Sequence, residues 1–399
     1  MRVIVHDFSG HPFQAELARS LAERGHDVLH VECGSYPSGK GSFEDAGSGA
    51  QFISLSVGAD QFERYRLMTR VVQELHYGVA FVRAARRFKP DLVISCNDPL
   101  LAKAIWSVWA ALARIPWIYW LQDLYSVAIA REAARRGPVD RLLARLLRRL
   151  EHRLLRSSDE IVSITADFDE TLEEWGVDLD VRTVIENWAP LEELKPMPRD
   201  NAWRAEMGLG DKFLYLYAGT LGLKHDPDVL YDLADDEPDS EVVVVTEGLG
   251  AARLETRQAE RYLPNLRVLP FQPWDRLAEV LGSADVLVVL LEAEAGAFSV
   301  PSKILTCLCA GRPILASIPE ANLGARTIER AGAGIVVPPG RHDALLEAAR
   351  KLRADDDMRE SMGSDARSYA VTAFDIDSIT DRFLAVIHGA AGAARKVPE

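Results

Sequence analysis

The sequence predicts an α/β protein with two domains, each a doubly wound parallel sheet, that face each other across a cleft. Short apolar runs rich in β-branched residues alternate with longer amphipathic stretches along the chain, which is the pattern of βαβ units. There are more of these runs than one doubly wound sheet usually has strands, and the pattern restarts near Phe213. A length of 399 residues suits two separate cores. Because ligands of such sheets bind beyond the carboxyl ends of the strands, we expect the site in the cleft.

Strands are predicted wherever a short apolar or β-branched run lies between turn-forming residues. The predicted strands span residues 2–6, 27–32, 92–95, 117–121, 160–164, 181–185, 213–218, 241–246, 266–270, 286–291, 313–316 and 333–337. Stretches with helical period lie between them, for example at residues 12–24, 66–87, 138–156, 226–233, 274–282 and 302–310. Strand and helix alternate in each half, so both domains are expected to be Rossmann-like.

The linker between the domains is predicted at residues 187–211. This segment contains Pro190, Pro196 and Pro198 among mixed charges, and it has no sustained apolar period. We therefore assign residues 1–190 to the first domain and begin the second at residue 191.

Charge and cysteine content limit the class of function. The chain has 46 Lys and Arg against 60 Asp and Glu, a net charge of -14, which excludes a surface that binds nucleic acid throughout. The cysteines are dispersed apart from the pair Cys307 and Cys309, and no histidine cluster stands at metal-ligand spacing beside them. This composition is typical of a protein of a reducing, cytoplasmic compartment.

Signals for export or membrane insertion are not expected. The N-terminus runs directly into a strand, without the charged and long apolar regions of a signal peptide. The longest apolar stretch, residues 100–121, carries Lys103 and Arg114 and is interrupted by Pro116. A buried helix followed by a buried strand fits this stretch better than a membrane span.

Two loops that follow predicted strands carry candidate ligand-binding residues. After the first strand, Gly10 permits a tight turn before a helix and His11 follows, so this loop is either structural or ligand-facing. In the second half, Gly219 and Gly222 free backbone N–H groups and Lys224 follows them. That arrangement suits a diphosphate, although Lys224 can equally be a solvated surface residue.

The most specific pattern lies at residues 292–303, where a strand leads into a loop of small residues and then a helix. Ser302 can cap this helix, and Lys303 begins it. The helix dipole and the charge of Lys303 would both favour an anion there. The alternative is an ordinary polar cap followed by a first-turn lysine.

Several of these segments together resemble the retaining glycosyltransferases of family 4, in particular the branch that builds bacterial capsules, exopolysaccharides and O-antigens, including colanic-acid-type enzymes. The segments that carry the resemblance are GHPFQAELARSLAERGHDVLHV, WLQDLY, YAGTLGLK, VVVVTEGLG, LGSADVLVVLL and FSVPSKILTCLCAGRPILASIP. The resemblance implies the GT-B architecture, transfer from a nucleotide-diphosphate sugar with retained configuration, and no essential metal or other cofactor. It also implies that a last helix, at residues 374–387, returns to the first domain. The domains then become 1–190 with 380–399, and 191–379.

The resemblance places the donor on the second domain, with UDP favoured over GDP. Gly219 and Thr220 match the loop that meets the phosphates, and Lys224 and Lys303 match catalytic cations that stabilise the departing diphosphate. The other expected donor contacts are Glu247, Gly248, Gly250, Phe271, Gln272 and Ser302, with Glu294 or Ser299 facing the sugar. The family commonly has two carboxylates in its donor motif, but Phe298 and Thr306 occupy those positions here.

On the acceptor side, the polar candidates are His11 and Asp123, and Gly10 is a further candidate. Asp123 has an ordinary alternative as a loop cap. The residues leave the general base unassigned. The resemblance implies that the leaving phosphate itself helps to deprotonate the acceptor.

The segment from Arg131 to Arg156 is strongly basic in an acidic chain, and leucines interleave its arginines. A helix here would have an apolar and a basic face, suited to the anionic inner face of the plasma membrane or to a lipid-diphosphate acceptor. The alternative is a core-packed helix with solvated arginines. For the whole chain, the alternatives to a transferase are a non-catalytic scaffold on the same fold, or a nucleotide-sugar epimerase or sugar-phosphate synthase.

Overall fold

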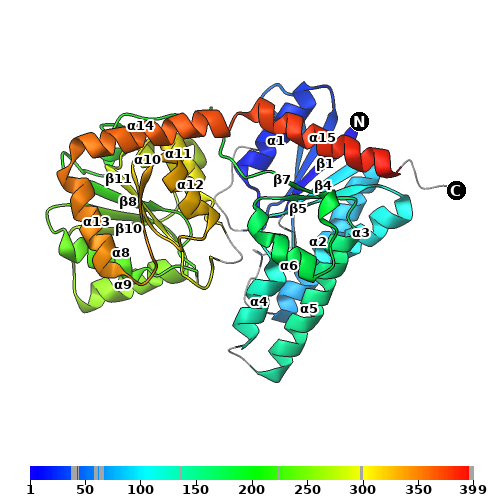
Figure 1. The fold of residues 1–399 in the computed structure, drawn as a ribbon, viewed down its shortest axis with the longest axis horizontal. Coiled ribbons are helices and arrows are strands. Elements are labelled where there is room, and N and C mark those ends of the chain that lie inside the picture. Colours follow the sequence, from blue (N-terminus) through cyan, green and yellow to red (C-terminus); the bar gives the residue numbers. More distant parts are fainter. Residues whose placement is uncertain are drawn as a thin grey trace. The chain divides into compact units, whose positions relative to one another are not determined.

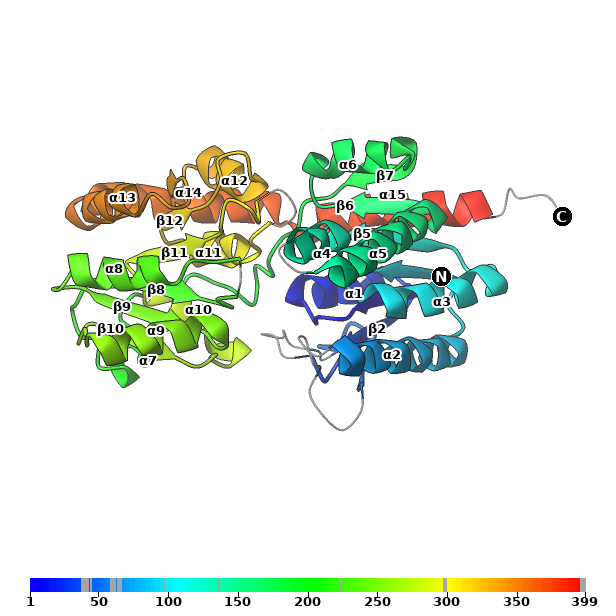
Figure 2. The same cartoon turned by 90° about the horizontal axis from the view of Figure 1, so that it is seen from below.

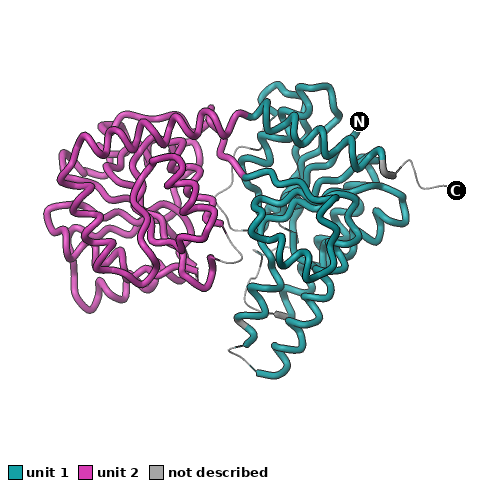
Figure 3. Tube along the Cα trace, viewed as in Figure 1, with its two compact units in different colours: residues 1–186, 376–399 teal, residues 187–375 magenta. Residues whose placement is uncertain are grey.

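The chain folds into two α/β units, in each of which helices flank a parallel sheet (Figures 1 and 2). Our computed structural model describes residues 1–36, 43, 45–57, 62, 67–96, 98–134, 137–222, 224–296 and 300–394. Unit 1 is Met1–Glu186 with Ile376–Glu399, and unit 2 is Asn187–Asp375 (Figure 3). The predicted α/β class is confirmed. The predicted boundaries, 190/191 and 379/380, lie a few residues after those of the units.

Unit 1 contains, within the described residues, a seven-stranded parallel sheet in the order β3-β2-β1-β4-β5-β6-β7. Its central strands are buried along their whole length, as expected of a sheet covered on both faces. The strands are β1 (Arg2–Asp7), β2 (Asp27–Cys33), β3 (Gln51–Leu55), β4 (Leu92–Ser95), β5 (Trp117–Leu121), β6 (Glu160–Ser163) and β7 (Arg182–Val184).

Strand β3 is absent from the sequence prediction. It lies at the edge of the sheet and pairs with β2 alone, from Leu29 opposite Gln51 to Cys33 opposite Leu55. Its residues are half-buried or exposed, so the run QFISL lacks the apolar content of the buried strands. An edge strand is held mainly by backbone hydrogen bonds, which leave little signal in the side-chain pattern.

The helices of unit 1 are α1 (Pro12–Glu23), α2 (Leu67–Phe88), α3 (Leu100–Ala113), α4 (Tyr125–Ala134), α5 (Pro138–Ser157), α6 (Asp169–Glu174) and α15 (Ile376–Ala394). The last of these comes from the far end of the chain. Phe383 of α15 packs on Trp120, with ring centroids 4.7 Å apart, and Thr380 donates a hydrogen bond of 2.9 Å to Ser20 on α1. Apolar and polar contacts thus fix α15 on unit 1.

Unit 2 contains, in the part that the structure describes, a six-stranded parallel sheet in the order β10-β9-β8-β11-β12-β13. Its strands are β8 (Leu214–Ala218), β9 (Glu241–Val245), β10 (Leu266–Leu269), β11 (Val286–Leu290), β12 (Ile314–Ser317) and β13 (Gly334–Val337). Its helices are α7 (Ala202–Glu206), α8 (Asp228–Asp236), α9 (Leu249–Glu260), α10 (Leu277–Gly282), α11 (Lys303–Ala310), α12 (Leu323–Ala331), α13 (His342–Ala354) and α14 (Asp356–Ala373).

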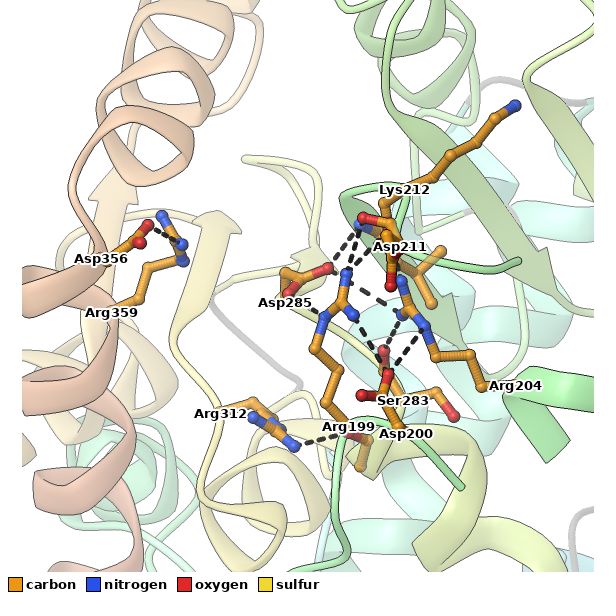
Figure 4. Close-up of polar contacts among 12 residues, drawn as sticks. Arg199, Asp200, Arg204, Asp211, Lys212, Ser283, Asp285, Arg312, Asp356 and Arg359 are labelled. Atoms are coloured by element: carbon orange, nitrogen blue, oxygen red, sulfur yellow. Dashed lines mark hydrogen bonds and ion pairs between the residues drawn. The ribbon is translucent and has the colours of Figure 1, made fainter. Parts of the chain in front are cut away.

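The predicted linker, residues 187–211, is instead a packed part of unit 2. Trp203 is fully buried and donates from Nε1 to Gln272, at 3.1 Å. Arg199 binds Asp285, with Nε 2.7 Å from Oδ1, and Arg204 donates to the carbonyl of Ser283 at 2.6 Å (Figure 4). The apolar residues of this segment are irregularly spaced, so they produce no period although they are buried.

The apolar stretch at residues 100–121 forms a helix and a strand as predicted, α3 and β5. Strand β5 is buried throughout, whereas α3 is buried on one face only, with Val108 and Leu112 60% and 83% exposed. Among the described residues, no helix has the length and apolar content needed to cross a membrane.

Candidate functional site

The carboxyl edge of the sheet in unit 2 brings Lys303 to the glycine loop after β8. Strands β8 and β11 are neighbours, so the loops that follow them meet at one edge. Gly219 has φ +137°, and a Cβ atom there would lie 3.2 Å from Cε and 3.3 Å from Nζ of Lys303. The glycine therefore leaves the space that the lysine side chain occupies.

Lys303 rests on the ring of Tyr217, with Nζ 3.9 Å from the ring centroid, and also contacts the Tyr217 hydroxyl. That hydroxyl donates to the carbonyl of Thr220 at 2.9 Å. Among the residues that the structure describes, Lys303 has no carboxylate within ion-pair distance. Burial lowers the pKa of Lys303 to about 7. An anionic ligand would therefore stabilise the charged form of this ammonium group.

The start of α9 packs against the same loop. Gly250 donates its N–H to the carbonyl of Leu221 at 2.9 Å, and a Cβ atom on Gly250 would lie only 2.2 Å from Cβ of Leu221. Gly248 precedes the helix with φ +91°. Glycines at these positions allow a helix N-terminus to approach the loop closely.

Other donor candidates lie around this edge. Thr220 and Glu294 are exposed, and Lys224 is half-buried with its carbonyl accepting from the N–H of Glu292 at 2.8 Å. Glu247 accepts from the N–H of Phe271 at 3.2 Å. A shallow cavity at this edge is lined by Asp226, Val229, Leu290, Leu291, Glu292, Ser317, Gly340 and His342.

One expectation about the donor side, the cap by Ser302, is wrong, and the roles of Thr306, Gln272 and Ser299 stay predictions. Ser302 makes no side-chain cap for α11, because its backbone is already helical, with φ -59° and ψ -23°. The Thr306 hydroxyl donates to the carbonyl of Lys303 at 2.9 Å within the helix. The amide oxygen of Gln272 already accepts from Trp203. Phe298 and Ser299 lie outside the described residues.

Sequence reasoning missed Tyr217 and His225 near this loop. Nδ1 of His225 accepts from the N–H of Gly222 at 3.1 Å. Burial, together with the charge of Lys303, lowers the pKa of His225 to about 3, so the ring is neutral at physiological pH. Tyr217 sits two residues before Gly219 in a strand, where an aromatic residue carries no sign of a functional role.

On unit 1, His11 is paired with Asp7, which the sequence analysis did not single out. Nδ1 of His11 lies 2.9 Å from Oδ2 of Asp7. Gly10 has φ +76°, so this turn needs a residue that tolerates the left-handed region. Asp123 follows β5, and its negative charge acts on His11. The structure thus brings the acceptor-side candidates together.

A buried polar network lies beneath this loop. Nζ of Lys103 is 2.7 Å from Oδ1 of Asp98, and Trp106 donates to Oδ2 of Asp98 at 2.7 Å. Ser95 donates to Asp98 at 3.0 Å and also contacts His6, at 3.1 Å. These side chains are almost completely buried. From the sequence, Lys103 was interpreted only as a charge that disfavours a membrane span, and its buried ion pair was not predicted.

The basic segment forms part of α4 and most of α5, which lie side by side (Figure 1). Glu151 of α5 is buried and accepts the N–H groups of Tyr125 and Ser126 at 3.0 and 2.9 Å, which ties α5 to the start of α4. Leu154 and Leu155 are buried, as the core-packing alternative requires.

The other face of α5 is both apolar and basic. Val139, Leu142 and Leu146 are 77%, 56% and 50% exposed. The exposed arginines of the helix are Arg141, Arg145, Arg148, Arg149, Arg153 and Arg156. The helix thus combines a packed face with a surface on which apolar and cationic side chains adjoin.

Comparison with known proteins identifies the class. Residues 11–188 match the glycosyl transferase 4-like domain, and residues 200–369 match the glycosyl transferases of group 1. These two matches together cover most of the chain. The chain therefore belongs to the glycosyltransferases that combine a glycosyl transferase 4-like domain with a group 1 domain.

Individual relatives agree with this membership. The chain is 25% identical over 314 residues to the protein of Escherichia coli K12 named as the colanic acid biosynthesis glycosyl transferase WcaI, covering 77% of this chain and 76% of that protein. It is 30% identical over 233 residues to the D-inositol 3-phosphate glycosyltransferase of Xylanimonas cellulosilytica, covering 55% and 54%.

Solved structures share the fold. The sucrose-phosphate synthase of Thermosynechococcus elongatus matches with a TM-score of 0.75 at 18% identity, covering 98% of this chain and all of that one. Anabaena HepE, in complex with UDP and glucose, matches with a TM-score of 0.73 at 16% identity, covering 97% and 99%. The architecture is the two-domain GT-B fold.

Proposed function

We propose that this glycosyltransferase moves a sugar from a nucleotide-diphosphate sugar to a lipid-linked or polysaccharide acceptor in the synthesis of a surface glycan, with retention of anomeric configuration. The observation that carries the proposal is the Lys303 ammonium, which lies over Tyr217 beside the Gly219 loop at the start of α11. A diphosphate bound there would pair with the Lys303 ammonium, which has no carboxylate within ion-pair distance among the described residues. The relation to WcaI supports a glycan product.

UDP is the proposed donor nucleotide, and the complex of HepE with UDP supports this choice by analogy of fold. The test is a panel of UDP- and GDP-sugars, measured first by thermal shift and then by transfer to added acceptors. Stabilisation by one nucleotide sugar and transfer with that donor alone would support the proposal. Turnover of the donor without any acceptor would instead indicate an epimerase. Failure of every donor to bind would favour the scaffold alternative.

Transfer is expected to continue in the presence of EDTA. The described residues contain no group of three His, Cys, Asp or Glu side chains arranged to hold a metal ion. We propose that Lys303 and Lys224 neutralise the diphosphate in place of a cation. Initial rates with EDTA, and with Mg²⁺ or Mn²⁺ added back, measure this. Activity that is lost with EDTA and returns with either ion would contradict the prediction.

We further propose that α5 docks the enzyme on the cytoplasmic face of an anionic membrane, where a lipid-linked acceptor is available. The exposed apolar residues Val139, Leu142 and Leu146 would enter the interface while the arginines meet lipid phosphates. Each basic residue near such a surface contributes about 1 kcal/mol. The net charge of -14 would otherwise repel the chain from it.

Reversing Arg141, Arg145 and Arg148 to Glu is expected to abolish binding to anionic liposomes in sedimentation at low salt. A charge-matched control reverses Arg83, Arg86 and Arg87, which are exposed on α2. The control should still bind, and wild-type binding should weaken at high salt. Equal loss of liposome binding in both variants would show that binding depends on net charge alone, and would contradict docking through α5. No wild-type binding, with full activity on a soluble acceptor, would contradict the docking proposal.

A further inference from the structure

We propose that His342 is a positioning residue for donor binding, because it bridges Asp226 at the end of the loop between β8 and α8 to Asp232 on α8. This inference deepens the proposed function and rests on it, since the same loop carries Gly219 and Lys224, where the diphosphate is proposed to bind. The contacts that support it lie within unit 2.

The imidazole ring of His342 lies between two carboxylates. Its Nε2 is 3.0 Å from Oδ2 of Asp226, and its Nδ1 is 2.8 Å from Oδ2 of Asp232. Because His342 begins α13, the ring connects the start of that helix to the loop and to α8. The other oxygen of Asp226 accepts the N–H of Asp228 at 2.9 Å, so this carboxylate is held on both sides.

The residues next to Asp226 connect the bridge to the part of the loop that is proposed to bind the diphosphate. Asp226 directly follows His225, whose Nδ1 accepts the N–H of Gly222 at 3.1 Å. The carbonyl of Lys224 accepts the N–H of Glu292 at 2.8 Å, which joins the loop to the end of β11. A displacement of Asp226 would therefore shift the backbone at Gly222 and Lys224.

Only the protonated ring can donate to both carboxylates. A neutral imidazole has one N–H, so it would donate to one carboxylate and direct a lone pair at the other, whereas the imidazolium donates from both nitrogens. Burial lowers the pKa of His342, but the hydrogen bonds to Asp232 and Asp226 and the charges of these groups outweigh it, so the pKa lies above its ordinary value. The bridge is therefore complete at acidic pH and loses one hydrogen bond as the pH rises through this pKa.

Other charged groups near the bridge preserve this behaviour. They are Asp228 on α8, Arg253 and Arg257 on α9, Glu292 after β11, and Arg341 and Asp343 at the start of α13. Glu292 lines the same shallow cavity as His342, and the charge of His342 acts on its carboxyl group. Both arginines of α9 form ion pairs with Asp228, and Arg341 pairs with Asp343. The carboxylates that face the ring therefore favour the imidazolium.

The first test is the affinity for UDP, measured by isothermal titration calorimetry from mildly acidic to mildly alkaline pH. At acidic pH, His342→Gln should raise the Kd by about 5-fold or more, a usual coupling between a distant group and a binding site. The ratio of the variant Kd to the wild-type Kd should fall toward one at alkaline pH, where wild type also lacks the second donor. The titration of Lys303 affects both proteins alike and cancels in this ratio.

Arg341→Gln is the matched control at the same end of α13, because it breaks the ion pair with Asp343, 3.0 Å long, and leaves the bridge in place. This control should bind UDP as wild type does. Equal affinity of wild type and His342→Gln at every pH would overturn the role of His342 and leave the donor site intact. Failure of wild type to bind UDP or GDP would overturn the proposed function, and the positioning role with it.

The second test uses wild type and so does not depend on the folding of a variant. Ring ¹⁵N NMR should show that UDP binding raises the pKa of His342, because the coupling between protonation and binding is reciprocal. A bridge that only stabilises the fold would titrate identically with and without UDP, and that result would overturn the proposal. In His342→Gln, the amides of residues 219–222 and 224–226 should exchange hydrogen faster than in wild type at acidic pH, while those of β9 should not change.

Discussion

Replacing Lys303 by alanine is expected to raise the Kd for the donor nucleotide by roughly 10- to 150-fold, because a hydrogen bond to a charged group contributes about 1.5 to 3 kcal/mol. The loss should be large because the ammonium is partly withdrawn from water beside Tyr217. Isothermal titration calorimetry with the nucleotide diphosphate measures it. Lys351→Ala, at an exposed position on α13, is the matched control and should bind as wild type.

The same lysine makes donor binding depend on pH. Since burial lowers the pKa of Lys303 to about 7, the free protein loses this proton as the pH rises through neutrality. A diphosphate favours the protonated form, so binding above that pH should take up a proton and affinity should fall. Calorimetry in buffers of different ionisation enthalpy counts the proton.

Lys303→Arg retains the charge, so it should show a flatter pH profile than wild type. Equal affinity of wild type and Lys303→Ala across the pH range would remove Lys303 from the diphosphate site. Lys224→Ala should weaken binding in the same direction if Lys224 shares the diphosphate.

How far the sequence predicts this fold depends on where the hydrophobic signal lies. Buried strands such as β4, β5 and β9 are continuous apolar runs in the sequence, and their predicted ranges agree closely with the structure. The edge strand β3 and the packed segment at 187–211 have no such run. Strand β3 is held by backbone pairing, and the segment at 187–211 is held by irregularly spaced tryptophans and arginines.

The candidate site divides in a similar way. Lys303 and Gly219 were predicted because a helix start and a glycine turn are local in sequence. Tyr217 lies in a strand and gains its role from a lysine 86 positions away, a contact that only the pairing of β8 with β11 creates. The pairing of Asp7 with His11 was missed for another reason. The two residues are close in sequence, but a sequence pattern does not show whether their side chains meet across the turn in which Gly10 has φ +76°.

Replacing Lys103 by methionine is expected to lower the free energy of unfolding by about 3 to 5 kcal/mol, because it leaves the Asp98 carboxylate buried without its cation. The two groups are 2.7 Å apart and at most 1% exposed. Nζ of Lys103 also lies 3.7 Å from the ring centroid of Tyr119, so the variant loses a second favourable contact. Equilibrium urea unfolding, followed by tryptophan fluorescence, measures the change.

The double variant Lys103→Met with Asp98→Asn is the decisive comparison. It removes both charges while the asparagine oxygen can still accept from Trp106, so much of the lost stability should return. Lys195→Met breaks the exposed pair with Glu192, in which Nζ and Oε2 are 2.8 Å apart, and should leave the free energy of unfolding almost unchanged because solvent screens both charges. If the single and double variants of the buried pair were equally unstable, packing around Asp98 would explain the loss and the unpaired charge would not.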